Sequence, residues 1–203
     1  GKPEKMTART IRVPLPDGKS VERTLYSTRF GPVVTMPQAM VNWTDRIAFA
    51  VRDANRGNQR AVGTWLMIAR ARDVGEIRDA VTQSLAIPWV NTIAADRHGD
   101  ALHADVTAVP NVPAAKIKAC ATPLSPAVAR AAVLLDGSKS ACAWDEAAGT
   151  SVPGLMPARD QAIYQRRDYV ANMNDSYWLS NPRVPHAPLS PILGPTEQQI
   201  GRA

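Results

Sequence analysis

Alternating apolar and polar positions predict a β-hairpin near the start of the chain. The segments TIRVPLP (10–16) and SVERTLYST (20–28) flank Asp17 and Gly18, a dipeptide typical of tight hairpin turns. GPVVTM (31–36) continues the strand character, and IAFAVRD (47–53) has the apolar alternation of a buried strand. We therefore expect residues 1–60 to be rich in strands.

Helical periodicity replaces this alternation after residue 60. TWLMIARA (64–71) is apolar and compatible with a helix. A second helix is expected to begin at Asp73, because Asp73 and Glu76 have the spacing of a capping box. Apolar residues then recur on one face of that helix: Ile77, Val81 and Leu85.

The segment after the second helix predicts another hairpin and then long loops. IPWVNTIAADRHGDALHADVTAVP (87–110) has two apolar runs around a glycine-containing turn, so residues 61–110 should hold a helix and a hairpin. Residues 111–157 are rich in Pro, Ala and Gly, with a short helical patch at 127–135. Residues 157–170 could be a short helix or an extended segment, and the tail from Asn181 is loop-like. This order predicts an α+β fold rather than a doubly wound sheet.

Composition and charge narrow the class of protein. The chain has 203 residues, 45% of them hydrophobic, which is enough to bury a core. Its net charge is +6, but the arginines are scattered, which argues against a nucleic-acid-binding surface. No apolar run is long enough to cross a bilayer, and the polar first residues do not resemble a signal peptide. Both ends look like cuts in a longer polypeptide.

The two cysteines, Cys120 and Cys142, leave two interpretations open. A disulfide between them would stiffen a loop-rich excursion. Alternatively, both are buried thiols, as in many cytosolic proteins. We favour the disulfide, and with it a secreted or periplasmic protein.

A cluster of His and Asp residues marks the second predicted hairpin. Asp96 and His98 lie at its turn, and alternation places His103 and Asp105 on one face of the following strand. A metal site needs three or four converging ligands with a second shell. We expect these side chains to flank the turn and face solvent, so no metal site is predicted.

Trp65, Trp89 and Asn174 are candidates for a binding or catalytic site. Each tryptophan could pack in the core or form the wall of an apolar acyl pocket. The Asn174 amide could donate a hydrogen bond to an oxyanion, although an Asx turn explains it equally simply. No motif of a serine or cysteine nucleophile is present.

Four phrases occur in one order along the chain: STRFGPVV, AVRDAN, IPWVNTIAADRHGDAL and ANMNDSYWLSNP. Together they resemble the β chain of the penicillin acylase family of N-terminal-nucleophile hydrolases. Within that family they are most similar to acyl-homoserine-lactone acylases and aculeacin A acylase. The NxNDSxW and PWVNTxAAD phrases are the specific ones, and the resemblance covers nearly the whole chain.

This resemblance implies an αββα sandwich, of which residues 1–203 would be a single central fragment. The fragment would comprise a strand-rich part (1–60), a helix and hairpin (61–110), a disulfide-tied loop region (111–160) and a segment with the oxyanion asparagine (161–203). Family members are exported precursors that cut themselves into α and β chains. The new N-terminal serine of the β chain attacks an amide carbonyl, with its own α-amino group as base. That serine would lie upstream, so the fragment alone should be inactive.

The resemblance also assigns roles to individual residues, and it implies no metal or organic cofactor. The implied roles are an oxyanion donor (Asn174), an arginine that orients it (Arg202), acyl-pocket walls (Trp65, Trp89 and Val90) and a disulfide (Cys120 and Cys142). The implied partners are the α chain, the remaining β-chain segments and a small acyl amide.

The function predicted from the resemblance is removal of a long acyl chain from an N-acyl amide, such as an acyl-homoserine lactone or a lipopeptide. Two alternatives remain open. The chain could be a non-catalytic binding or structural module on the same scaffold, or part of a β-lactam acylase that differs in pocket volume.

Overall fold

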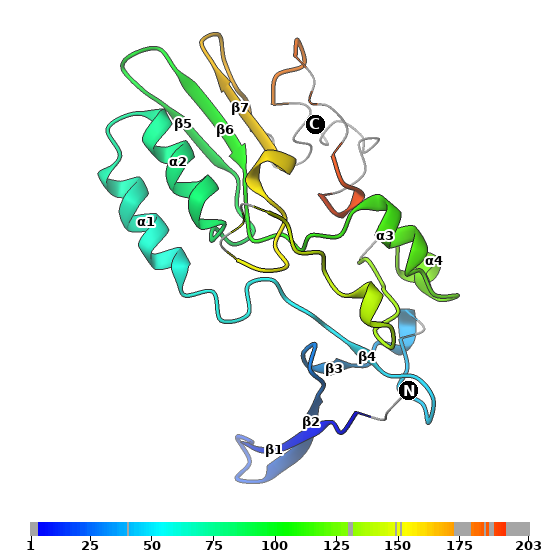
Figure 1. The fold of residues 1–203 in the computed structure, drawn as a ribbon. Helices are drawn as coiled ribbons and strands as arrows, with labels where there is room; N and C mark the ends of the chain where they lie inside the picture. Colours follow the sequence, from blue (N-terminus) through cyan, green and yellow to red (C-terminus); the bar gives the residue numbers. More distant parts are fainter. Residues whose placement is uncertain are drawn as a thin grey trace. The chain divides into compact units, whose positions relative to one another are not determined.

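The computed structural model describes residues 4–39, 41–129, 132–148, 150, 152–172, 180–184, 186 and 189–193 (Figure 1). The chain divides into two compact units. The first comprises residues 1–53 and 123–134, and the second comprises residues 54–122 and 135–203. Within the described ranges, no helix combines the length and apolar character needed to cross a membrane.

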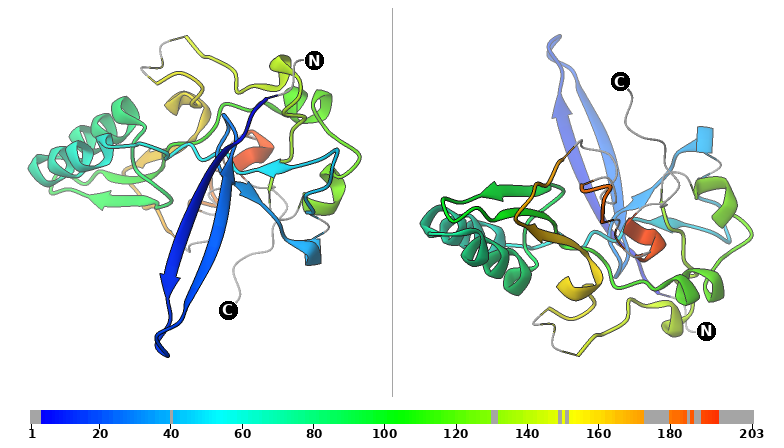
Figure 2. Two further views of the ribbon diagram at one scale, coloured as in Figure 1. Left: turned by 90° about the horizontal axis from the view of Figure 1, so that it is seen from below. Right: turned by 90° about the horizontal axis from the view of Figure 1, so that it is seen from above.

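The first unit contains the predicted hairpin. Strands β1 (Thr7–Pro14) and β2 (Ser20–Ser27) pair antiparallel along their full length, with Thr7 opposite Ser27 and Pro14 opposite Ser20. Gly18 takes φ +77° in the turn, a conformation that glycine adopts without steric cost. Figure 2 shows the pair as a long two-stranded ribbon. The hairpin prediction is confirmed.

The predicted strand at 47–53 is much shorter than expected. Only β4 (Phe49–Ala50) pairs, with β3 (Val33–Val34), and Ile47 and Val51 are each 47% exposed. The Thr44 hydroxyl accepts hydrogen bonds from the backbone N–H groups of Arg46 and Ile47, so a turn precedes the strand and shortens it. The prediction of a buried strand is therefore wrong except at Phe49.

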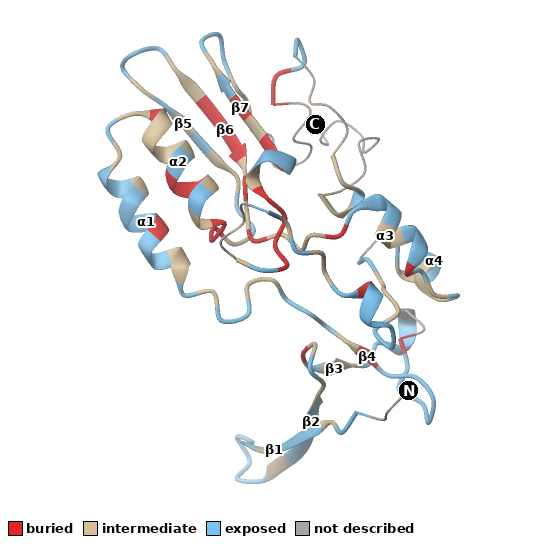
Figure 3. Ribbon diagram, in the orientation of Figure 1, coloured by how far each residue is buried: buried red, intermediate tan, exposed pale blue. Residues whose placement is uncertain are grey.

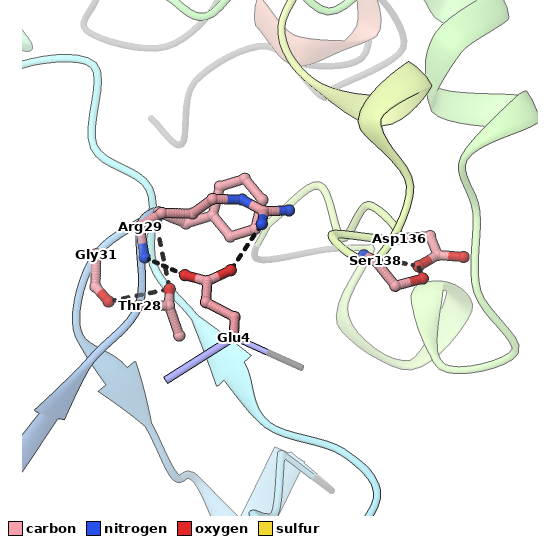
Figure 4. A network of polar contacts seen from close by, with 7 residues as sticks. Glu4, Thr28, Arg29, Gly31, Asp136 and Ser138 are labelled. Atoms are coloured by element: carbon pink, nitrogen blue, oxygen red, sulfur yellow. Dashed lines mark hydrogen bonds and ion pairs between the residues drawn. The ribbon is translucent and has the colours of Figure 1, made fainter. Parts of the chain in front are cut away.

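Polar contacts fix the start of the first unit. The Glu4 carboxylate accepts hydrogen bonds from the backbone N–H and the guanidinium of Arg29, at 2.8 and 2.7 Å (Figure 4). The Arg29 guanidinium also lies 4.6 Å from the centre of the Phe30 ring. The remaining helices of this unit are short: η1 (Pro37–Ala39) and α4 (Ser125–Val128).

The second unit is built on a three-stranded antiparallel sheet in the order β5 (Thr92–Ala95), β6 (Ala101–Asp105), β7 (Ala162–Arg166). The predicted hairpin is β5 and β6. Residues 157–170 hold a short helix, η3 (Ala158–Asp160), followed by β7, so the extended alternative is the main one. Helix α2 (Val74–Ser84) packs against β5 and β6, and helix α1 (Arg60–Arg70) lies beside α2 and packs against it (Figure 1).

Two aspartates define where α2 begins. Asp73 caps the helix by accepting from the Glu76 N–H at 2.9 Å, which confirms the predicted start. Asp96, in the β5–β6 turn, accepts from the Val74 N–H at 3.2 Å and from the His98 N–H at 2.8 Å. The turn of the hairpin is thereby attached to the first residue of the helix.

The core of the second unit lies between α2 and the sheet (Figure 3). Its residues come from α2, from β6 and from the segments that follow them. Burial of this apolar surface is the main favourable term for the unit. The core consists of Val74, Val81, Leu85, Ile87, Leu102, Ala104, Val106, Ala108 and Leu155.

The loop region 111–157 is tied by a disulfide and by one lysine. Cys120 and Cys142 are bonded, as predicted, with Cα atoms 5.6 Å apart. Lys116 donates to the Ala141 and Ala143 carbonyls at 2.9 and 2.7 Å and pairs with an acidic neighbour, Asp145, at 2.6 Å. Among the described residues of the predicted helical patch at 127–135, only 127 and 128 lie in a helix, α4. Three further short helices lie outside that patch: α3 (Ala114–Ala119), η2 (Ser140–Cys142) and η5 (Pro191–Leu193).

We predict that Gly31→Ala strongly destabilises the first unit. Gly31 has φ +152°, and an added methyl group would overlap the backbone carbonyl of Val51. The free energy of unfolding should fall by about 3 kcal/mol or more, measured by urea unfolding. Gly63→Ala is the matched control, because Gly63 lies in α1 with open space around it and should gain about 0.5–1 kcal/mol. Equal stabilities for the two variants would contradict the overlap.

The disulfide predicts that the denatured, unreduced chain has no reactive thiol. Two reactive thiols would show that Cys120 and Cys142 are not bonded in the protein. Replacing both cysteines with serine should lower the free energy of unfolding by about 3 kcal/mol, because the bond closes a loop with a sequence separation of 22. Urea unfolding with and without reductant measures this loss.

Candidate functional site

The two segments that flank residues 173–179 in the sequence lie side by side. The Ala171 N–H donates to the Ser180 carbonyl at 2.7 Å, so residues 168–172 and 180–184 form a stem, the name used below for these two segments. The predicted oxyanion donor, Asn174, lies in the sequence between the two sides of this stem. The stem therefore fixes the positions of the residues that precede and follow 173–179 in the sequence.

The stem is joined to the segment before β5. The Asn91 side chain donates from Nδ2 to Oδ1 of Asn172 at 3.1 Å, across a sequence separation of 81 residues. Trp89 and Val90 immediately precede Asn91. The structure thus brings two predicted parts of the site together, the PWVN segment and the segment that leads into Asn174. Sequence reasoning named neither Asn91 nor Asn172; their place inside these two phrases was the only available signal.

Trp89 has an unusual conformation for a large residue. Its φ is +55° and 79% of its surface is exposed, while Val90 is 43% exposed. The left-handed conformation costs roughly 1–2 kcal/mol for a residue with a Cβ atom. The side chain gains no burial within this chain, so Trp89 does not belong to the core of the second unit. Strain and exposure together are typical of functional positions.

Trp65 also lies on the surface, but on a different element. It is 50% exposed on α1, a helix that is largely exposed (Figure 3), and it belongs to a row of exposed apolar side chains on that helix. Trp65 likewise does not belong to the core of the second unit. The other members of the row are Val62, Leu66 and Met67.

Asn174 and Arg202 lie outside the described residues. Their predicted roles remain predictions. The described residues closest to Asn174 in sequence are those of the stem.

The His and Asp cluster differs from its prediction. His103 is 1% exposed on the central strand, so the expectation that it faces solvent is wrong. Burial, with a smaller effect of the nearby His186, lowers the pKa of His103, and burial raises the pKa of Asp105. The cause is that β6 is buried on both faces: Leu102 and Ala104 pack toward α2, whereas His103 is paired with Ile93 and Tyr164 of the neighbouring strands on the other face.

The donor set of the second unit suits hydrogen bonding rather than metal binding. Across the described ranges, no three His, Cys, Asp or Glu side chains gather as ligands of a metal ion. Cys120 and Cys142 are bonded to each other, so neither is a thiolate nucleophile. What the geometry does supply is an amide-rich stem beside exposed apolar side chains.

Comparison with known proteins identifies close relatives. The profile of the family described as penicillin amidase matches residues 1–198. The chain is 38% identical over 195 residues to "Acyl-homoserine lactone acylase PvdQ" of Pseudomonas savastanoi pv. phaseolicola, covering 95% of the chain and 24% of the relative. It is 40% identical over 196 residues to "Aculeacin-A acylase" of Actinoplanes utahensis, covering 96% of the chain and 25% of the relative. The chain therefore spans about a quarter of the length of these relatives.

A solved structure shares the fold. A thermostable penicillin G acylase from Alcaligenes faecalis superposes with a TM-score of 0.56 and 18% sequence identity, covering 84% of this chain and 29% of that one. At this identity the likeness concerns the fold alone, and it agrees with the mixed helices and sheets described above. The family profile and the identities over nearly the whole chain establish the relationship: this chain belongs to the penicillin amidase family.

Proposed function

We propose that this chain is part of an acylase that hydrolyses the amide bond of a long-chain acyl amide, such as an acyl-homoserine lactone or a lipopeptide. The observation that carries this proposal is the hydrogen bond between Asn91 and Asn172. It joins the segment with the exposed Trp89 to the stem that flanks Asn174 in the sequence. Relatives named acyl-homoserine lactone acylase and aculeacin-A acylase support the same substrate class.

In the proposed mechanism, a serine at the N-terminus of the β chain attacks the amide carbonyl. Its own α-amino group takes the proton, and the serine lies outside this chain. The Asn174 amide donates to the oxyanion of the tetrahedral intermediate, where a donor is worth most because charge develops there. Arg202 orients Asn174. The chain needs its α chain and the remaining β-chain segments to act.

The apolar part of the substrate would contact Trp65, Trp89 and Val90. Their exposed surface is available to an acyl chain, and rigid aromatic walls limit the length of that chain by shape. The disulfide between Cys120 and Cys142 supports an oxidising compartment, so we infer a secreted or periplasmic enzyme.

Asn174→Ala in the processed parent enzyme should lower kcat by about 10²–10³-fold, with little change in KM. The reason is that an oxyanion donor acts in the transition state rather than in the bound substrate. The measurement is release of the free amine from a long-chain acyl-homoserine lactone, followed over a range of concentrations. Melting temperature and the intact masses of the chains show whether folding and processing are preserved. A near-normal kcat would remove Asn174 from the oxyanion hole.

Trp89→Gly should change substrate choice without loss of stability. Glycine relieves the left-handed conformation at this position, so the free energy of unfolding should be unchanged or rise by about 1 kcal/mol. The kcat/KM profile against acyl-chain length should shift, because a pocket wall is removed. Trp43→Ala is the control, since Trp43 is an exposed tryptophan of the first unit with no proposed role in binding. An unaltered acyl-chain-length profile for Trp89→Gly would exclude Trp89 from the pocket. In the unmodified enzyme, faster hydrolysis of a β-lactam than of any acyl-homoserine lactone would favour the β-lactam acylase alternative.

A further inference from the structure

A single amide side chain is buried in the stem and has every polar atom paired. Asn181 is 0% exposed. Its Nδ2 donates to Oδ2 of Asp168 at 3.2 Å and to the Tyr169 carbonyl at 3.0 Å. Its Oδ1 accepts from the Arg183 N–H at 3.1 Å. Asn181 therefore crosses from one side of the stem to the other and also shapes the turn that follows it.

These contacts require an amide at position 181. The side chain must donate two hydrogen bonds and accept one within a fully buried space. A carboxylate of the same shape could accept but not donate, and it would lie beside the Asp168 carboxylate. An alanine would remove the partner of three polar groups: the Asp168 carboxylate, the Tyr169 carbonyl and the Arg183 N–H. Each of these groups would lose a hydrogen bond.

The stem is also attached to the sheet through Asp168. Arg166, the last residue of β7, donates from Nε and Nη2 to the two carboxylate oxygens of Asp168, at 2.9 and 3.1 Å. These bonds, with help from the Tyr169 N–H and Asn181, hold the pKa of Asp168 well below its usual range. The carboxylate thus stays ionised at neutral pH. A paired Arg–carboxylate fork fixes direction as well as distance.

A second attachment lies at the other end of the same segment. Asn172 is bonded to Asn91, just before β5, while Asp168 is bonded to Arg166 at the end of β7. Residues 168–172 are therefore held to the sheet at both ends. Asn181 then ties the returning side of the stem to the held side, next to the Ala171–Ser180 backbone bond.

We propose that Asn181, acting through Asp168, is a positioning residue that fixes the two described segments, 168–172 and 180–184, that flank Asn174 in the sequence. The inference rests on the proposed role of Asn174 as oxyanion donor. A donor must lie within about 0.5 Å of its productive position to act fully on the transition state. Asn181 touches no reacting atom, and its effect on rate passes through the stem.

The test compares four variants of the processed parent enzyme: Asn181→Asp, Asp168→Asn, the double exchange Asn181→Asp with Asp168→Asn, and Arg97→Ala. Asn181→Asp keeps the shape, removes both donors and brings two carboxylates together. The double exchange places an amide opposite a carboxylate again. Arg97→Ala is the control, because Arg97 is an exposed arginine in the β5–β6 turn, outside the stem. The substrate is a long-chain acyl-homoserine lactone, and kcat and KM are measured separately.

Asn181→Asp should lower kcat about 10–100-fold with KM changed less than threefold, because the lost interaction belongs to the transition state. The double exchange should recover part of the loss, and Arg97→Ala should keep kcat near that of the unmodified enzyme. The ratio of unmodified to Asn181→Asp kcat should also shrink as the pH is lowered. Repulsion from Asp168 raises the pKa of the introduced carboxyl, which can donate a hydrogen bond once it is protonated.

The outcomes separate this inference from the proposed function. If Asn174→Ala lowers kcat but Asn181→Asp leaves it unchanged, the proposed function stands and the positioning role is overturned. If Asn181→Asp lowers only the yield or melting temperature, with normal kcat per folded enzyme, its role is merely structural and the inference also fails. If Asn174→Ala has normal kcat, or the parent enzyme hydrolyses no acyl amide, the proposed function fails and the inference with it.

Discussion

The pairing of β6 with a neighbour on each side is the constraint on which the second unit depends. Leu102 and Ala104 place their side chains in the core toward α2, while His103 is equally buried on the opposite face. A strand buried on both faces of a small sheet fixes its register strictly, because a slip of one residue would exchange the two sets of side chains. The positions of β5 and β7, and of the segments attached to them, follow from this register.

The register also explains why the chain must fold back after β7. Thr92 at the start of β5 lies opposite Ala104, whereas Arg166 at the end of β7 lies opposite Ala101. Asn91 and Arg166 are therefore at different ends of the sheet. Residues 168–172 must return along it for Asn172 to reach Asn91, and the Arg166–Asp168 pair lies where that return begins.

The parts that could be predicted from the sequence are those set by neighbouring residues. Asp17 and Gly18 identify the first hairpin, and Asp73 with Glu76 identifies the start of α2, because turns and caps are local hydrogen-bond arrangements. The burial of His103 and the formation of β7 could not be predicted from neighbouring residues in this way. Both depend on pairing across about 60 residues of loop-rich chain, as in His103 opposite Tyr164. The contact between Asn91 and Asn172 has the same origin: the phrases around these residues identify a family, and only the fold shows that they touch.

The two sides of the candidate site differ in burial and in backbone strain. Trp89 is strained and exposed, so its conformation lowers the stability of this chain and gains nothing within it. Asn181 is buried, and each polar atom of its side chain has a hydrogen-bond partner. A surface that contacts a flexible acyl chain needs exposed apolar area and tolerates imprecision, because dispersion contacts vary gradually with position. An oxyanion donor depends on direction and distance, so the segment that positions it needs paired, buried polar groups. The strain and exposure of Trp89 therefore fit its proposed role in selecting acyl chains by shape. The buried, paired side chain of Asn181 fits its proposed role in positioning the oxyanion donor.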